Sequence, residues 1–311
     1  MQLIEEKKDI YSIFGILFML LTALIQAFIA LTVKTTTQIV SINLQIIAYY
    51  CVPLFFLLPL AFIQFKETIK TNNLALHFLR GLFSYCSVYS FFYAIKCLPL
   101  GISATLFNSI PLFVPIVSRL ILKEKLSIKN YFGLGIALIG VLFILNPKFD
   151  TFSPQAVLIG LFSAILMACS SVLLRKLALA KEPVKKIVFY QYLSCSCFTI
   201  LSIAIENVLY SSFKGAIFKN VSWIHTNLLI LLGCLSWSAQ VTFSKASFYL
   251  PASKLAPFFY ASVPISSLLG YLFLAQKIHP LVFIGSGFIF LGIYFCTHQG
   301  KYFNFKNRTA I

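Results

Sequence analysis

Charged residues are scarce in this chain, and acidic ones are the scarcer kind. Only 11% of the 311 residues are charged, and Asp and Glu together number 8. A soluble domain carries about 25% charged residues, so this chain has too little polarity to cover a water-facing surface. Because 59% of its residues are hydrophobic, the sequence predicts an all-α protein embedded in a membrane.

No acidic residue falls in the middle of an apolar run. Glu206 is the deepest acid, and it lies where a run ends. Proton pumps and many cation carriers place an Asp or Glu at the membrane centre, where it trades a proton or pairs with a cation. The sequence therefore argues against carboxylate-gated proton antiport and against a multidrug exporter built on a buried Glu. The acids are Glu5, Glu6, Asp9, Glu67, Glu124, Asp150, Glu182 and Glu206.

Metal-binding and catalytic patterns are missing as well. The four histidines lie near the ends of apolar runs, far apart and without metal-ligand spacing. Cys195 and Cys197 would point to roughly opposite faces of a helix, and all eight cysteines fit small buried apolar positions. We find no phosphate loop and no Ser–His–acid arrangement. The sequence predicts no enzyme, no metal site and no cofactor.

Basic residues are plentiful by comparison, and they give the chain a net charge of +17. No basic stripe with interleaved aromatics lies on a water-facing domain, so nucleic acid is not an expected partner. Basic residues instead gather at the cytoplasmic ends of membrane helices. With ten spans, 19 of the 25 Lys and Arg residues fall on the side that holds both termini. This asymmetry predicts that both termini are cytoplasmic.

The apolar runs number ten, and each approaches the roughly 20 residues that a membrane-spanning helix needs. The first run is too long for the core of a cleavable signal peptide, so we expect an uncleaved first span. The polar tail at 301–311 is expected to be cytoplasmic. The predicted spans are 12–33, 43–64, 77–97, 102–121, 130–146, 155–175, 187–206, 226–246, 254–274 and 279–297.

The chain repeats itself at a spacing of 152 residues. Leu98-Pro99 matches Leu250-Pro251, and three spaced glycines of the fifth run match three in the tenth. The predicted domains are therefore a first five-helix repeat at 1–152 and a second at 153–300. Because five is odd, the second repeat enters the membrane the other way up. Two inverted repeats imply a substrate site near the midplane between them.

These motifs together resemble a known family. Arg80-Gly81 opens the third span, Leu98-Pro99 joins the third and fourth, and Lys123-Glu124 precedes a glycine-rich fifth span. With the duplication, they resemble the EamA-like permeases of the drug/metabolite transporter superfamily. The resemblance covers nearly the whole chain, although Gln276 stands where the second repeat usually has Glu. It implies a ten-helix carrier of small metabolites in the bacterial inner membrane.

A second resemblance concerns the cargo. Leu79-Arg80-Gly81 and the Ile-Pro-Leu-Phe at 110–113 are similar to uptake carriers for S-adenosylmethionine in intracellular bacteria. The implied function is a secondary transporter that works by alternating access, with a small-molecule substrate and the lipid bilayer as partners. We expect a monomer or homodimer. The alternatives are an exporter of amino acids or other small metabolites, and a non-transporting membrane helper subunit.

The middle of the spans carries amides and aromatic rings in place of charges. Repeat symmetry pairs Tyr85 with Trp237 and Phe107 with Phe259, so these four are expected to frame one cavity. Amides offer hydrogen bonds, and rings offer apolar or cation–π contact to a polar cargo. The same side chains can instead bridge helices or sit at the membrane interface. The candidate substrate-binding residues are Gln26, Tyr85, Tyr89, Phe107, Asn108, Gln191, Trp237, Gln240, Phe259 and Tyr260.

Three further residues have two interpretations each. Arg80 either anchors the third span or holds a substrate carboxylate at the inner mouth. Pro111 and Pro264 remove backbone hydrogen bonds in the fourth and ninth spans. They either provide bend points for gating or only shape those helices.

Overall fold

The computed structural model describes residues 2–37, 39–63, 70–98, 100–123, 128–145, 153–210, 222–275 and 281–297, and these ranges are helical apart from short joints. Several residues of the sequence analysis lie outside these ranges. They are Glu67, Pro99, Glu124, Asp150, Gln276 and the tail at 301–311.

Each of the ten predicted spans coincides with one helix or with a run of two or three shorter helices. Six helical stretches are individually long and apolar enough to cross a membrane, and two shorter apolar helices accompany them, counting only what the structure describes. The elements are α1 (Gln2–Thr36), α2 (Ile42–Ile63), α4 (Leu74–Cys97), α5 (Leu100–Phe107), α6 (Ile110–Leu122), α7 (Ile128–Leu145), α8 (Pro154–Leu179), α9 (Val184–Tyr210), α10 (Trp223–Tyr249), α11 (Ala252–Leu255), the 3-10 helix η2 (Ala256–Ala261), α12 (Ser262–Leu274) and α13 (Leu281–Thr297).

The fourth and ninth spans are each broken near the middle. The fourth divides into α5 and α6 at Asn108-Ser109, and the ninth passes through η2 before α12 begins. Pro111 lies in the first turn of α6, where a missing N–H leaves no helical hydrogen bond unmade. Pro264 is the third residue of α12. Both prolines therefore lie at the start of the second half of a broken span. The breaks fall close to the bend points predicted from the sequence.

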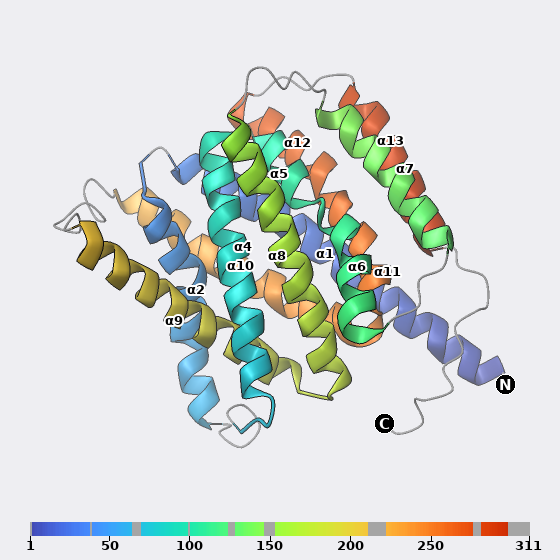
Figure 1. Ribbon diagram of the computed structural model, residues 1–311, viewed down its shortest axis with the longest axis horizontal. Coiled ribbons are helices and arrows are strands. Elements are labelled where there is room, and N and C mark those ends of the chain that lie inside the picture. Colours follow the sequence, from blue (N-terminus) through green and yellow to red (C-terminus); the bar gives the residue numbers. More distant parts are fainter. Residues whose placement is uncertain are drawn as a thin grey trace.

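The helices pack in a pattern that follows the repeat. The most extensive contacts join α1 to α10, α4 to α8, and α7 to α13, and each of these pairs takes one helix from each half. Exchanging the halves turns the α1–α10 pair into the α8–α4 pair, which is the signature of a two-fold relation. Figure 1 shows α7 and α13 side by side at one edge, away from α2 and α9. The fold is thus ten membrane helices arranged as two inverted five-helix repeats.

Matching glycines allow two equivalent close approaches. A Cβ placed on Gly81 of α4 would overlap Ser194 Oγ of α9. A Cβ placed on Gly233 of α10 would lie 2.8 Å from Val52 Cβ and 2.9 Å from the Ala48 carbonyl oxygen of α2. Small residues let membrane helices approach closely. The third span thereby packs on the seventh, and the eighth packs on the second.

Matching cations cap two helix ends. Lys34 at the end of α1 donates to the carbonyls of Ile95 and Leu98 at the end of α4, both at 2.8 Å. Arg175 near the end of α8 donates to the carbonyl of Ser247 and, at 3.4 Å, to that of Phe248. The last carbonyls of a helix are unpaired and carry partial negative charge. These two basic side chains are therefore stabilising elements of the fold.

Candidate substrate-binding site

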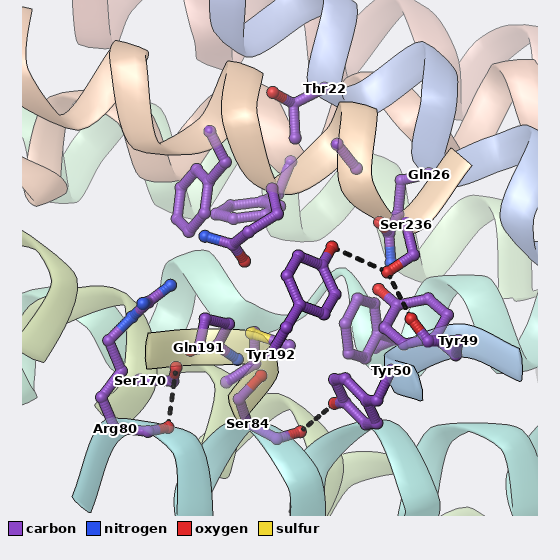
Figure 2. A pocket seen from close by; sticks show the side chains of 16 residues that line it. Thr22, Gln26, Tyr49, Tyr50, Arg80, Ser84, Ser170, Gln191, Tyr192 and Ser236 are labelled. Atoms are coloured by element: carbon purple, nitrogen blue, oxygen red, sulfur yellow. Dashed lines mark hydrogen bonds between the residues drawn. The ribbon is translucent and has the colours of Figure 1, made fainter. Parts of the chain in front are cut away.

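A cavity lies where the two repeats meet, and both halves line it. Spans one to four contribute from the first repeat, and α8, α9, α10 and η2 contribute from the second. Among the residues that line it, Arg80 is the one charged side chain. The lining residues are Thr22, Gln26, Tyr49, Tyr50, Arg80, Ser84, Phe107, Met167, Ser170, Gln191, Tyr192, Ser236, Ala239, Gln240, Phe243 and Phe259 (Figure 2).

Two pairs of lining residues occupy equivalent positions in the repeats. Phe107 and Phe259 are 152 residues apart, as are Ser84 of α4 and Ser236 of α10. The structure thus brings Phe107 and Phe259 to one cavity, as the repeat predicts. The Phe107 ring stacks on Phe91, with centroids 4.1 Å apart. This packing holds the ring as a rigid part of the wall.

Tyrosines of α2 and α9 form the centre of the wall. Tyr50 and Tyr192 each lie eight residues after the start of their helix, and their ring centroids are 6.4 Å apart. The Tyr50 hydroxyl donates to the Ser84 carbonyl at 3.2 Å. The Tyr192 hydroxyl shares a 2.9 Å hydrogen bond with Ser236 Oγ, which in turn donates to the Tyr49 carbonyl at 2.8 Å (Figure 2). Each tyrosine is thus held by a serine of its own repeat.

Three predicted amides line the cavity from three helices: Gln26 from α1, Gln191 from α9 and Gln240 from α10. Gln240 Nε2 donates to Ser244 Oγ at 2.9 Å. Gln191 Nε2 donates to Cys195 Sγ at 3.2 Å, and its Oε1 has no hydrogen-bond partner although the side chain is 2% exposed. A buried acceptor left open in this way is available to a ligand.

Arg80 lies deep in the protein, at 1% exposure. Its Nη1 donates to the Ile187 carbonyl at 3.4 Å, a long hydrogen bond, and its Nε has no partner. Its backbone carbonyl accepts from Ser170 Oγ at 3.4 Å (Figure 2). The side chain therefore contributes positive charge to a cavity whose other lining residues are neutral.

Tyr85 and Trp237 lie outside the cavity, which differs from the sequence-based expectation. Each follows a lining serine, Ser84 or Ser236, and consecutive helical residues point about 100° apart. The Tyr85 hydroxyl donates to Ser202 Oγ at 2.6 Å, so its ring stands behind Tyr50. Trp237 is 40% exposed on the outer surface of the bundle. The repeat correctly paired the two positions, but they face away from the cavity.

Three other candidates also lie off the cavity lining. Asn108 and Tyr260 occupy equivalent positions at the breaks of the fourth and ninth spans, and both are buried. Asn108 Nδ2 donates to the Ala104 carbonyl at 2.6 Å, which fits a role at the helix break. Tyr89 is half-buried beside Tyr85, with ring centroids 6.2 Å apart. None of the three is among the residues that line the cavity.

Several lining residues are not among those predicted from the sequence, and they include Tyr49, Tyr50 and Ser84. Hydroxyl groups recur along many of these helices, so a lone serine or tyrosine gave no signal. One signal is nevertheless present in the sequence, because Ser84 and Ser236 match in the 152-residue repeat. The equivalence of Tyr50 and Tyr192 follows from the helix starts in the structure.

The cavity is small in this conformation. The space open to the centre of a water molecule is about 50 Å³. One such water needs roughly 10–15 Å³ of that space, whereas small-molecule sites measure roughly 300–1,000 Å³. The repeats must therefore separate at this point before a metabolite fits.

A polar cluster ties the two repeats together outside the cavity. Glu182, between α8 and α9, accepts from Thr71 Oγ1 at 2.6 Å and from Asn73 Nδ2 at 3.0 Å, and it pairs with Lys186 at 3.0 Å. Lys186 also donates to the Lys70 carbonyl at 2.6 Å. Burial acts to raise the pKa of Glu182, but the hydrogen bonds from Thr71, Asn73 and Lys186 outweigh it and hold the pKa below its usual value.

Comparison with known proteins identifies the class. The model of the EamA-like transporter family matches the chain twice, at residues 13–146 and 154–297. The chain belongs to this family, and it is a multi-pass membrane permease for small metabolites. A solved crystal structure superposes with a TM-score of 0.71 at 19% identity, covering 91% of this chain and 98% of that one. It supports the fold.

Named relatives carry different cargoes. The chain is 25% identical to the S-adenosylmethionine uptake transporter of Rickettsia felis, over 71% of this chain and 70% of that protein. It is 27% identical to the pseudopaline exporter of Pseudomonas aeruginosa, over 71% and 74%. It is 26% identical to the riboflavin transporter of Vibrio cholerae, over 80% of each. Similarity at this level indicates a metabolite permease without selecting its substrate.

Proposed function

We propose that this permease works by alternating access, with S-adenosylmethionine as its cargo, taken up or exchanged across the bacterial inner membrane. Both termini lie in the cytoplasm, and the protein acts as a monomer or homodimer. The two repeats rock about the central cavity, and the breaks near Pro111 and Pro264 serve as bend points. The observation that carries the proposal is a cavity lined from both repeats by rings, amides and hydroxyls.

The chemistry of the lining suits this cargo. Tyr50 and Tyr192 present aromatic faces that attract a sulfonium cation by up to about 2 kcal/mol when it is desolvated. Phe107 and Phe259 offer surfaces on which an adenine can stack. No Asp or Glu is among the lining residues, so we propose coupling by exchange or by the gradient of the substrate itself.

Uptake into proteoliposomes tests the transport step. Purified protein should take up labelled S-adenosylmethionine, and preloading the vesicles with unlabelled compound should accelerate entry by exchange. Protein-free vesicles set the background. If the folded protein moves no S-adenosylmethionine and labelled riboflavin or aromatic amino acids enter instead, the cargo is one of those. A folded protein that moves none of them contradicts the carrier function.

Competition tests the role of the rings. S-adenosylhomocysteine keeps the adenine and the amino acid but lacks the sulfonium charge. Tyr192→Leu should lower the affinity for S-adenosylmethionine by up to about 30-fold, the equivalent of about 2 kcal/mol. The affinity for S-adenosylhomocysteine should fall much less. Tyr192→Phe, which keeps the ring, should retain most of the difference. Trp237→Leu is the matched control because Trp237 lies on the outer surface. Equal losses for both ligands in Tyr192→Leu would refute the cation–π contact.

A further inference from the structure

Two buried polar groups in the cavity wall have no hydrogen-bond partner. They are Nε of Arg80 and Oε1 of Gln191, on side chains that are 1% and 2% exposed. Buried polar groups in folded proteins are bonded in the large majority of cases, and each exception calls for a reason. One is a charged donor and the other a neutral acceptor, so together they have the polarity to hold a ligand that carries both charges.

The two groups share one corner of the cavity. The Arg80 guanidinium reaches from α4 to the Ile187 carbonyl of α9, at 3.4 Å from Nη1. Gln191 is four residues further along α9 and therefore lies on the same face, one turn away. Figure 2 draws both side chains among those that line the cavity.

Guanidinium groups bind carboxylates in a bidentate geometry, and an amide oxygen accepts hydrogen bonds from an ammonium. In an α-amino acid the carboxylate and the ammonium are attached to the same carbon. We infer that Arg80 and Gln191 bind the α-amino-carboxylate end of the substrate, so that the transported class is metabolites with an amino-acid end. This inference rests on the proposed function, and it favours an amino-acid conjugate over a ligand such as riboflavin, which has no carboxylate.

A comparison with the other buried cations supports a role in binding. Arg175 donates to the carbonyl of Ser247 at a helix end, and Lys186 pairs with Glu182 at 3.0 Å. Arg80 has one long bond, and within the described residues the ion pair closer than 4.0 Å is Glu182–Lys186, away from Arg80. A charge buried without a counter-charge destabilises a protein unless something else compensates it. The carboxylate of the substrate would supply that compensation.

The repeat adds a second argument. The position equivalent to Arg80 in the second repeat is Leu232, which is fully buried and apolar. The cavity thus has matching residues at Ser84 and Ser236 and at Phe107 and Phe259, but its charge lies on one side only. The amino-acid end is oriented toward α4 and α9, and the rest of the ligand extends along the aromatic wall.

Ligand-induced thermal stabilisation of the purified protein tests the inference with four probes. S-adenosylmethionine is compared with its decarboxylated form, and methionine is compared with 4-(methylthio)butanoate, which lacks the ammonium. Wild-type protein should need at least about tenfold more of each truncated probe for equal stabilisation. Arg80→Gln should abolish the preference for the carboxylate and keep that for the ammonium, and Gln191→Leu should do the reverse. Arg80→Lys should retain part of the carboxylate preference.

Arg119→Gln is the matched control, because Arg119 is exposed on α6 and away from the cavity. Without ligand, the Arg80→Gln protein should melt at or above the wild-type temperature. If Arg80 were only a structural anchor, the variant would melt at a lower temperature.

Two results would overturn the inference. One is that Arg80→Gln and Gln191→Leu both keep the wild-type preferences among the probes. The other is that no probe stabilises the wild-type protein at millimolar concentration. If the protein binds the probes in this pattern but transports none, the proposed transport function fails and the binding assignment stands. If the protein transports S-adenosylmethionine but neither variant changes the preferences among the probes, the binding assignment fails and the proposed transport function stands.

Discussion

Single residues matter most where helices touch, and Gly81 is the clearest case. A Cβ at this position would overlap Ser194 Oγ and lie 2.6 Å from Ser194 Cβ. Gly81→Ala should therefore lower the free energy of unfolding by about 1–3 kcal/mol, because a tightly packed contact must open. Adding Ser194→Gly should restore most of the loss, since both clashing atoms belong to that side chain. Thermal unfolding in detergent measures each variant.

Gly135 of α7 provides the control for this pair. A Cβ there would meet no atom within 4 Å, so Gly135→Ala should be neutral or slightly stabilising, as expected for a helical glycine. A Gly81→Ala protein that is as stable as Gly135→Ala would show that α4 and α9 do not require their close approach.

At the scale of elements, the joint between α8 and α9 is held to the joint before α4 by Glu182. Because its pKa is lowered in the folded protein, its ionised form contributes stability that is present above the unfolded-state value and lost as pH falls through the folded-state value. The melting temperature of wild type should exceed that of Glu182→Gln above a pH of about 5, and the gap should close at lower pH. The loss at neutral pH should be roughly 1–3 kcal/mol, because the Thr71 and Asn73 donors lose a charged acceptor.

Glu206 supplies a matched comparison for Glu182. It is exposed at the far end of α9 and accepts a 2.7 Å hydrogen bond from Asn43. Glu206→Gln should change the melting temperature little, because an exposed polar contact is worth little. If the difference in melting temperature between wild type and Glu182→Gln stayed constant with pH, the ionised Glu182 carboxylate would not be the stabilising form.

The sequence predicted the elements better than the faces they present. Apolar length located the ten spans, and the 152-residue spacing matched Phe107 with Phe259. The face of each helix was harder to read, because lipid and the protein core both favour apolar side chains. Trp237 was therefore placed inside and Tyr50 overlooked. The hydrogen bonds that decide these orientations, such as that between Tyr192 and Ser236, form only when distant helices meet.

At the scale of the whole molecule, the inverted arrangement makes a topological prediction. The joint that contains Lys181 should face the cytoplasm, and Ser222 at the start of α10 should face the opposite side. Single cysteines at these two positions, in a chain whose own cysteines are replaced, should react differently with a membrane-impermeant reagent. Ser222→Cys should label in intact cells, and Lys181→Cys only after the membrane is permeabilised. Labelling of both positions from the same side would rule out the inverted repeats.

The pairing of helices across the halves has a consequence for synthesis. Roughly 190 residues separate the end of α1 at Thr36 from the start of α10 at Trp223, so at about 5–20 residues per second α1 waits roughly 10–40 s for its main partner. The Lys34 contact with the end of α4 lies within the first half and can form during that interval. The nascent first half therefore has its half-buried Lys34 hydrogen-bonded while its contact faces still touch lipid. Final assembly therefore requires the second half to be inserted into the same membrane near the first. Two separately expressed halves should be able to associate there.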